Sequence, residues 1–270
     1  MQNFRSESSA GLTRLVVDIG NTTAALALFS GDAEPIVESV PSAMFADSTA
    51  MRNVLADLSK KHCTPQAIAI CSVVPAAAAA GAVLLESLFS VPVLTIGSHL
   101  KLPFQFDYDN RATFGADRLA LCAWSCHLFE GKAVIAVDIG TAITFDVLDA
   151  SGAYRGGLIM PGLDMMSGAL HARTAQLPQV RIDKPASLLG RSTAECIRSG
   201  IFWGVVREIS GLIEAIADEL ACDSGQPVPE VIVTGGNSRI IAPELGAVVS
   251  LIDELAVLRG SDLLLRMNMR

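Results

Sequence analysis

The clearest pattern in the chain is an apolar run, a polar glycine turn and a second apolar run, and it occurs twice. Residues 15–29 form one copy and residues 135–148 form the other. The four residues Val17 to Gly20 recur as Val137 to Gly140, which is an offset of 120. Short apolar runs around such a turn are typical of β-hairpins. The repeat therefore predicts two related domains with one hairpin each.

The remaining pattern alternates between strands and helices, which indicates the α/β class. We expect the division near residues 130–132, giving an N-terminal domain over 12–130 and a C-terminal domain over 131–270. Residues 1–11 are polar and are expected to form a flexible tail. The expected strands are 67–72, 91–96, 152–161 and 231–234. The expected helices are 48–60, 75–89, 116–129 and 193–220. Two further helices are expected, one that ends near residue 171 and one that follows residue 236.

The alanine-rich stretch Pro75 to Phe89 is the most apolar part of the chain. It is shorter than the roughly 20 residues that a membrane-spanning helix needs, and it contains Glu86. We interpret it as a buried helix that begins at Pro75. The N-terminal residues lack the apolar core of a secretory signal. The sequence thus predicts a cytoplasmic protein with no membrane partner.

Charge and cysteine content narrow the function classes further. The chain has 270 residues, with 28 acidic and 20 basic side chains and a net charge of −8. This balance argues against nucleic acid as a partner. Six cysteines occur without a CxxC pair, and we interpret them as reduced core thiols. A metal site or disulfide that uses Cys122 and Cys126, four residues apart, stays open as an alternative.

The turn of the first hairpin carries residues that suit a phosphate group. Asp18 ends the first strand, and Gly20 lets an anion approach the backbone because it has no Cβ. The amides and hydroxyls of Asn21, Thr22 and Thr23 can donate to phosphate oxygens. Asp18 can hold Mg²⁺. The alternative is a plain hairpin turn with a capping aspartate, and the second copy of the motif favours the functional interpretation.

Two further turns extend this interpretation to a whole nucleotide. In the second hairpin, Asp138 can bind a cation and Thr141 can donate to a phosphate. Gly235 and Gly236 follow the strand 231–234, where an adenine and its ribose can lie close to the backbone. No GxxxxGK[ST] or GxGxxG motif is present, which argues against a P-loop protein and a dinucleotide enzyme.

A possible acid–base group lies at the start of the helix expected over 116–129. Gly115 and Ala116 precede Asp117, which falls in the first helical turn, where the helix dipole favours its charged form. A carboxylate there can accept the proton of a substrate hydroxyl during phosphoryl transfer. Arg118 can bind a carboxylate or a phosphate. The alternative is an ordinary N-terminal acid beside a solvent-facing arginine.

The three turns together resemble the acetate and sugar kinase/actin-like superfamily, whose ribonuclease H-like domains hold a nucleotide in the cleft between them. From about Leu12 to Leu265 the chain is similar to type III pantothenate kinases. The motifs that carry this resemblance appear in order: Asp18 to Thr22, Ser72 to Pro75, Asp107 to Asn110, Gly115 to Arg118, Asp138 to Thr144, Gly156 to Gly162, Arg173 to Pro178, Gly190 to Thr193 and Thr234 to Gly236.

The resemblance implies a homodimeric enzyme that uses ATP, Mg²⁺ and K⁺ or NH₄⁺ to phosphorylate pantothenate, the first step of coenzyme A biosynthesis. It implies Asp117 as proton acceptor, Asp18 as Mg²⁺ ligand and Asp138 as K⁺ ligand. Arg111 stands where the family usually has proline. The implied ATP-binding residues are Asp18, Ile19, Gly20, Asn21, Thr22, Thr23, Ala24, Ala25, Thr141, Gly235 and Gly236, and the implied pantothenate-binding residues are Tyr108, Gly115, Ala116, Asp117, Arg118 and Thr193.

Two rival functions remain at this stage. One is another small-molecule kinase or phosphatase of the same superfamily, because the acceptor residues indicate pantothenate only by resemblance. The other is a nucleotide-binding regulatory protein. Loss of Asp117 or of the first phosphate turn would favour the regulatory protein, and both are present.

Overall fold

A computed structural model describes residues 11–31, 33–46, 48–224 and 228–269 of the chain. The described residues fold into two compact units. The first contains the segment up to Pro103, Tyr108–Trp124 and the segment from Ala256 onwards. The second contains Phe104–Asp107 and Ser125–Leu255. Apart from Gly11, the expected N-terminal tail lies outside the described residues.

The first unit is built on a five-stranded sheet with the order β3-β2-β1-β4-β5. Strand β1 is antiparallel to β2 and parallel to β4. The strands are β1 (Thr13–Ile19), β2 (Thr23–Ser30), β3 (Ile36–Pro41), β4 (Ala67–Ser72) and β5 (Val93–Thr95). Its helical segments are η1 (Ser42–Ala46), α1 (Ser48–Lys61), α2 (Pro75–Phe89), η2 (Arg111–Thr113), the start of α3 (Ala116–Leu128) and α7 (Ala256–Asn268).

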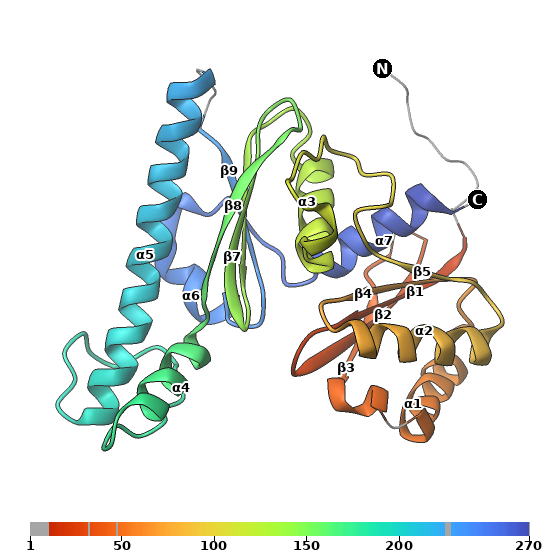
Figure 1. Ribbon diagram of the computed structural model, residues 1–270, viewed down its shortest axis with the longest axis horizontal. Helices are drawn as coiled ribbons and strands as arrows, with labels where there is room; N and C mark the ends of the chain where they lie inside the picture. Colours follow the sequence, from red (N-terminus) through yellow and green to blue (C-terminus); the bar gives the residue numbers. More distant parts are fainter. Residues whose placement is uncertain (1–10, 32, 47, 225–227, 270) are drawn as a thin grey trace. The chain divides into compact units, whose positions relative to one another are not determined.

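Side chains along β1 point alternately to the two faces of the sheet. Leu15, Val17 and Ile19 join the core formed with α1 and α2. Arg14 and Asp18 lie on the opposite face, where α7 packs on β1 and β4. Figure 1 shows α1 and α2 on one side of this sheet and α7 on the other. The face that carries Asp18 is therefore covered by the C-terminal helix.

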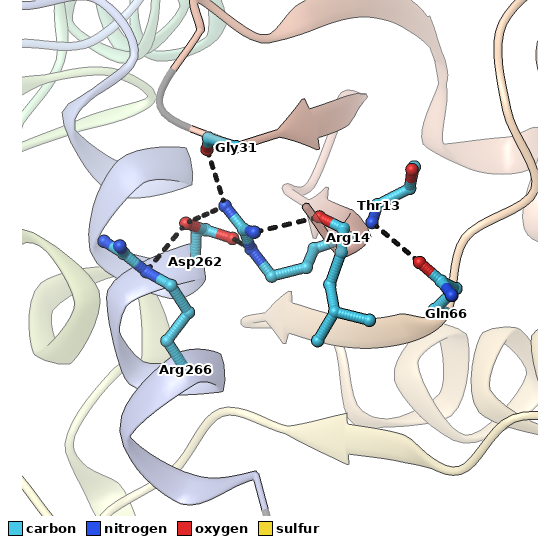
Figure 2. Close-up of polar contacts among 7 residues, drawn as sticks. Thr13, Arg14, Gly31, Gln66, Asp262 and Arg266 are labelled. Atoms are coloured by element: carbon cyan, nitrogen blue, oxygen red, sulfur yellow. Dashed lines mark hydrogen bonds and ion pairs between the residues drawn. The ribbon is translucent and has the colours of Figure 1, made fainter. Parts of the chain in front are cut away.

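Helix α7 is attached to β1 by a buried ion pair, drawn in Figure 2. Arg14 Nε lies 2.6 Å from Asp262 Oδ1, and both side chains are almost fully buried. The same guanidinium donates to the carbonyls of Leu12 and Gly31, and Arg266 adds a second ion pair to Asp262 at 3.2 Å. These contacts satisfy the buried guanidinium, which an apolar surrounding would otherwise destabilise.

The second unit repeats this plan with the sheet order β10-β9-β6-β7-β8. Strand β6 is antiparallel to β7 and parallel to β9, as β1 is to β2 and β4. The strands are β6 (Val134–Ile139), β7 (Ala142–Leu148), β8 (Tyr154–Pro161), β9 (Glu230–Thr234) and β10 (Leu251–Ile252). The helical segments are α4 (Leu163–Arg173), α5 (Thr193–Ser224), α6 (Ser238–Leu245) and η3 (Gly246–Val248).

Helices α5 and α6 cover one face of this second sheet (Figure 1). Ile135, Val137 and Ile139 of β6 pack there against α5 residues that include Phe202 and Ile209. Asp138 therefore lies on the face opposite to α5, just as Asp18 lies opposite to α1 and α2. The two hairpins predicted from the repeat are confirmed, and so is the α/β class.

The structure corrects two sequence-based expectations and contains three elements that the sequence pattern did not predict. The alanine-rich helix α2 is a surface helix, because only Gly81, Leu84 and Leu85 are fully buried and Val83 is 69% exposed. The six cysteines are free, but Cys63, Cys196 and Cys222 are exposed rather than in the core. Strands β3 and β10 and helix α7 were not expected.

The compact units also differ from the linear division expected near residue 130. The difference arises because α7 packs with the N-terminal segments although it lies at the end of the chain, and because Phe104–Asp107 and residues 125–130 belong to the second unit. Among the described residues, no helix is both long and apolar enough to cross a membrane.

Candidate functional site

The first predicted phosphate turn lies at the end of β1. The amide of Gly20 donates to the carbonyl of Thr23 at 3.1 Å, which closes the turn. Asn21, Thr22 and Thr23 are exposed, as donors to a bound phosphate need to be. Asp18, Gly20 and Ala25 are partly buried, whereas Ile19 and Ala24 turn their side chains into the core. Ile19 and Ala24 can therefore contribute only backbone atoms to this site.

Two serines hold this turn in place. Ser42, at the start of η1, donates its hydroxyl to the carbonyl of Gly20 at 2.7 Å and its amide to the carbonyl of Thr22 at 3.0 Å. Ser72 at the end of β4 donates its hydroxyl to the carbonyl of Ile19 at 3.1 Å. Ser72 belongs to a motif noted in the sequence, but Ser42 was missed. No local pattern marks Ser42, because its role depends on a contact 22 residues away.

Asp117 lies in the first turn of α3, as predicted. Its Oδ1 atom accepts a hydrogen bond from the amide of Arg118 at 2.8 Å. A Cβ on Gly115 would overlap this same oxygen, so only glycine leaves room for the carboxylate to fold back over the helix start. Gly115 thus contributes to the site because it has no side chain. The side chain of Ala116 is buried.

Asp18 and Asp117 are close enough for their charges to interact. Burial raises the pKa of Asp18 to about 7, and the neighbouring Asp117 carboxylate adds to this rise. A hydrogen bond with the Cys71 thiol lowers the pKa of Asp18 in part. Cys71 pairs with Asp18 across β1 and β4 and is fully buried. The result is a pair of acidic side chains on one face of the first unit.

Burial also raises the pKa of Asp117 above its ordinary value. The amide and the guanidinium of Arg118 lower the pKa of Asp117, as a helix N-terminus is expected to do. Their effect is smaller than the effect of burial. The sequence had suggested that the helix start favours the charged form. Removal from water prevails instead, and a carboxylate with a raised pKa is a better proton acceptor.

Arg118 is 8% exposed, so the solvent-facing alternative is excluded. Its guanidinium carbon lies 4.3 Å from the centre of the Phe114 ring. Tyr108 packs edge-on against the same ring, with 5.0 Å between centroids. Phe114 therefore brings together Tyr108 and Arg118, two of the side chains predicted to contact pantothenate. Arg111 is exposed in η2.

The second predicted phosphate turn lies in the second unit at the end of β6. The amide of Gly140 donates to the carbonyl of Ala142 at 3.0 Å, and Thr141 is exposed. Gly162 donates its amide to the carbonyl of Thr141 at 2.9 Å. A Cβ on Gly162 would overlap the carbonyls of Gly140 and Thr141. Backbone atoms, rather than serine side chains, support this second turn.

Gly235 of the predicted adenosine turn lies directly against the second phosphate turn. It has φ +94°, and a Cβ there would overlap both Asp138 Oδ1 and the backbone of Ile139. The amide of Asn237 donates to the carbonyl of Ile139 at 2.9 Å. The structure thus brings Asp138, Thr141 and the Gly235–Gly236 pair together within the second unit.

Thr193 is exposed at the first position of α5. The amide of Glu195 donates to the Ser192 hydroxyl, and the amide of Arg191 donates to the Glu195 carboxylate. Such reciprocal bonds define the start of a helix. The position of Thr193 is thus set by Ser192, which belongs to a motif noted in the sequence, and by Glu195, which was missed.

Asp18 and Asp138 are the two side chains predicted to bind cations. The described part of the chain holds no group of three or more His, Cys, Asp or Glu side chains that could bind a metal alone. Mg²⁺ in phosphoryl-transfer sites typically uses one or two carboxylates together with substrate phosphates and waters. Asp18 with the nearby Asp117 fits that description, because a cation would relieve the repulsion between them.

Comparisons with known proteins place these features in a family. The sequence profile of the type III pantothenate kinase family matches residues 14–215. The type III pantothenate kinase of Chlorobaculum tepidum is 70% identical over 270 residues, which is the full length of both chains.

Solved structures share the fold at low sequence identity. A ROK family glucokinase from Streptomyces griseus, in complex with glucose and AMPPNP, has a TM-score of 0.52 at 14% identity, covering 94% of this chain and 99% of its own. A conserved protein from Campylobacter jejuni, described as a Baf family transcriptional activator, has a TM-score of 0.53 at 19% identity, covering 93% of this chain and 97% of its own.

The similarity to the glucokinase confirms the fold class but says nothing about the activity of this chain. The family is shown by the profile match and by the full-length relative. The chain is therefore a kinase that belongs to the type III pantothenate kinase family.

Proposed function

We propose that this chain transfers the γ-phosphoryl group of ATP to the hydroxyl of pantothenate, the first step of coenzyme A biosynthesis, with Asp117 as proton acceptor. The observation that carries the proposal is the arrangement of Asp117. Its carboxylate is held at the start of α3 beside Asp18, with a raised pKa, in a chain 70% identical to a named pantothenate kinase.

Asp117 acts on the acceptor hydroxyl. The Arg118 amide holds Oδ1, which leaves Oδ2 as the oxygen that receives the proton. Phosphoryl transfer depends mainly on positioning and on charge stabilisation, so a fixed carboxylate is what this step requires. Tyr108, Arg118 and Thr193 bind pantothenate, and the charge of Arg118 suits its carboxylate.

ATP binds to the two phosphate turns and the adenosine turn. The exposed residues Asn21, Thr22 and Thr23 contact phosphate oxygens in the first unit, and Thr141 does so in the second. Gly235 and Gly236 lie beside the adenosine. Mg²⁺, held by Asp18, neutralises phosphate charge when bound. Asp138 binds a monovalent cation, K⁺ or NH₄⁺.

We also propose a homodimer that works in the cytoplasm. Exposed apolar side chains on β8 and α4 support the dimer, because such surfaces commonly mark interfaces. Ile159 is 65% exposed on the edge strand β8, and Met165 is 50% exposed on α4. Free thiols throughout the described chain suit a reducing compartment. Light scattering of the wild type and of Ile159→Glu tests the dimer, and a wild-type monomer would refute it.

The first experiment measures ADP release with ATP, Mg²⁺ and pantothenate, in K⁺ and separately in Na⁺. We expect turnover that needs pantothenate and is faster in K⁺. Asp117→Asn is expected to keep its fold and to lose at least about 10²-fold in kcat. Asp218→Asn, an exposed position on α5, is the matched control and keeps wild-type activity.

Each part of the proposal can fail separately. Full turnover by Asp117→Asn would show that this residue is not the proton acceptor. Pantothenate-independent ADP release, or release with another alcohol only, would reject the acceptor and favour a different kinase of the superfamily. Equal rates in K⁺ and Na⁺ would reject the selectivity for K⁺.

A further inference from the structure

The second hairpin contains a shielded hydroxyl group that the proposed function leaves unused. Thr144 on β7 pairs directly with Asp138 on β6. Directly opposite residues of antiparallel strands point to the same face, with their Cβ atoms about 4.5–5.5 Å apart. Thr144 Oγ1 is shielded from solvent and has no hydrogen-bond partner in the described part of the chain. An unpaired buried hydroxyl costs free energy unless a ligand satisfies it.

The first hairpin shows that this hydroxyl is a specific feature of the second. Asp18 pairs with Ala25 on one side and with Cys71 on the other. Asp138 pairs with Thr144 on one side and with Thr234 on the other. The two related aspartates thus have different neighbouring side chains: an alanine and a cysteine beside Asp18, and two threonines beside Asp138. A carboxylate between threonines is a set of oxygen ligands, which hard cations such as K⁺ prefer.

The neighbouring backbone confines the Asp138 carboxylate. A Cβ on Gly235 would lie 2.2 Å from Asp138 Oδ1, and a Cβ on Gly140 would lie 3.4 Å from the same oxygen. Backbone from two turns therefore lies against this side chain. A phosphate is repelled by a carboxylate, so a hydroxyl paired with Asp138 is better placed to share a cation with it than to bind the nucleotide.

We infer that Thr144 Oγ1 is a ligand of the monovalent cation held by Asp138. The inference rests on the proposed cation site and adds a residue to it. It also accounts for the unpaired Thr144 hydroxyl, because the cation would be the partner of its oxygen. Removing the hydroxyl should then weaken K⁺ binding without disturbing the hairpin.

The test follows thermal unfolding of the full chain, with ADP present, as KCl replaces choline chloride at constant ionic strength. The wild type should be stabilised by K⁺ with a measurable half-saturating concentration. Thr144→Val, which keeps the side-chain shape, should raise this concentration at least about tenfold. Thr144→Ser, which keeps the hydroxyl, should stay within about threefold. Ile143→Val, on the other face of the same strand, is the matched control for packing and should leave the half-saturating concentration unchanged.

The outcomes separate the possible roles of the hydroxyl. An unchanged K⁺ response in Thr144→Val would overturn the inference, and a higher KM for ATP in that variant would then assign the hydroxyl to phosphate binding. Lower stability without K⁺ in Thr144→Val, with the K⁺ response intact, would show a packing role and also overturn it. Absence of K⁺ stabilisation in the wild type would reject the cation site. Pantothenate-dependent ADP release by the same preparation would show that the proposed kinase function survives that result.

Discussion

Asp117 Oδ1 occupies the space into which a side chain on Gly115 would extend. The two residues are therefore coupled: the glycine is needed so that the carboxylate can fold back to the Arg118 amide. This relationship explains why a glycine precedes the acid by two positions, and it makes the geometry of the proposed proton acceptor sensitive to a single methyl group.

Gly115→Ala is expected to displace Asp117 and to lower kcat by about tenfold or more, because misplacement of a reacting group is costly. Its KM for ATP should change little, since the residue lies outside the phosphate turns. Steady-state kinetics checks both values. Gly211→Ala on α5, where a Cβ would meet nothing within 4 Å, is the control and should be active. Wild-type kcat in Gly115→Ala would contradict the coupling.

Ser42→Ala should weaken ATP binding. The hydroxyl of Ser42 holds the Gly20 carbonyl, and one such hydrogen bond contributes about 0.5–1.5 kcal/mol. The KM for ATP should therefore rise about three- to tenfold while the KM for pantothenate stays the same. Ser59→Ala removes a hydroxyl that bonds only within α1 and serves as the control. If both variants bind ATP like the wild type, the hydrogen bond from Ser42 to the Gly20 carbonyl has no role in nucleotide binding.

Asp18→Asn should make the metal-free and nucleotide-free chain more stable at pH 8. The folded-state pKa of Asp18 is raised to about 7 from an ordinary 3.8. Between these values the unfolded chain has released the proton while the folded chain keeps it, so stability falls as pH rises through this window. Asparagine avoids that loss, and we expect a gain of about 1–3 kcal/mol at pH 8.

Thermal unfolding in EDTA at pH 8 and at pH 4 measures this gain. The difference between Asp18→Asn and wild type should shrink toward pH 4, because the unfolded chain then begins to bind this proton as well. Asp57→Asn, at an exposed surface position, is the matched control. The stabilised Asp18→Asn variant should lose kinase activity, since it lacks the proposed Mg²⁺ ligand. A pH-independent effect would argue against the raised pKa.

Asp262→Ala should destabilise the chain strongly. It leaves Arg14 buried without its carboxylate, and breaking such a pair costs about 3–5 kcal/mol. Urea unfolding measures the loss. Glu244→Ala breaks the more exposed Lys184–Glu244 pair and should cost less than about 1 kcal/mol. The double variant Arg14→Met with Asp262→Leu should recover much of the stability. Equal losses in Asp262→Ala and Glu244→Ala would contradict this account.

The sequence alone determined the features that depend on neighbouring residues. The two hairpins follow from short apolar runs around Gly20 and Gly140, because alternation and turn chemistry act within a few residues. Helix α2 begins at Pro75 as expected, since proline suits the first helical position. Helix α1 and strand β4 also formed where expected. The repeated motif then indicated related domains, and both sheets have the same strand arrangement.

Only the tertiary structure decided which distant residues meet. Arg14 pairs with Asp262 across 248 positions, and no local pattern contains that information. Helix α7 was missed because Ser261 and Asp262 interrupt its apolar residues, yet both are buried against the first unit. The raised pKa of Asp117 likewise depends on burial, which overrides the effect of the helix start. Local periodicity specifies elements, whereas burial and charge pairing arise only when separate segments pack together.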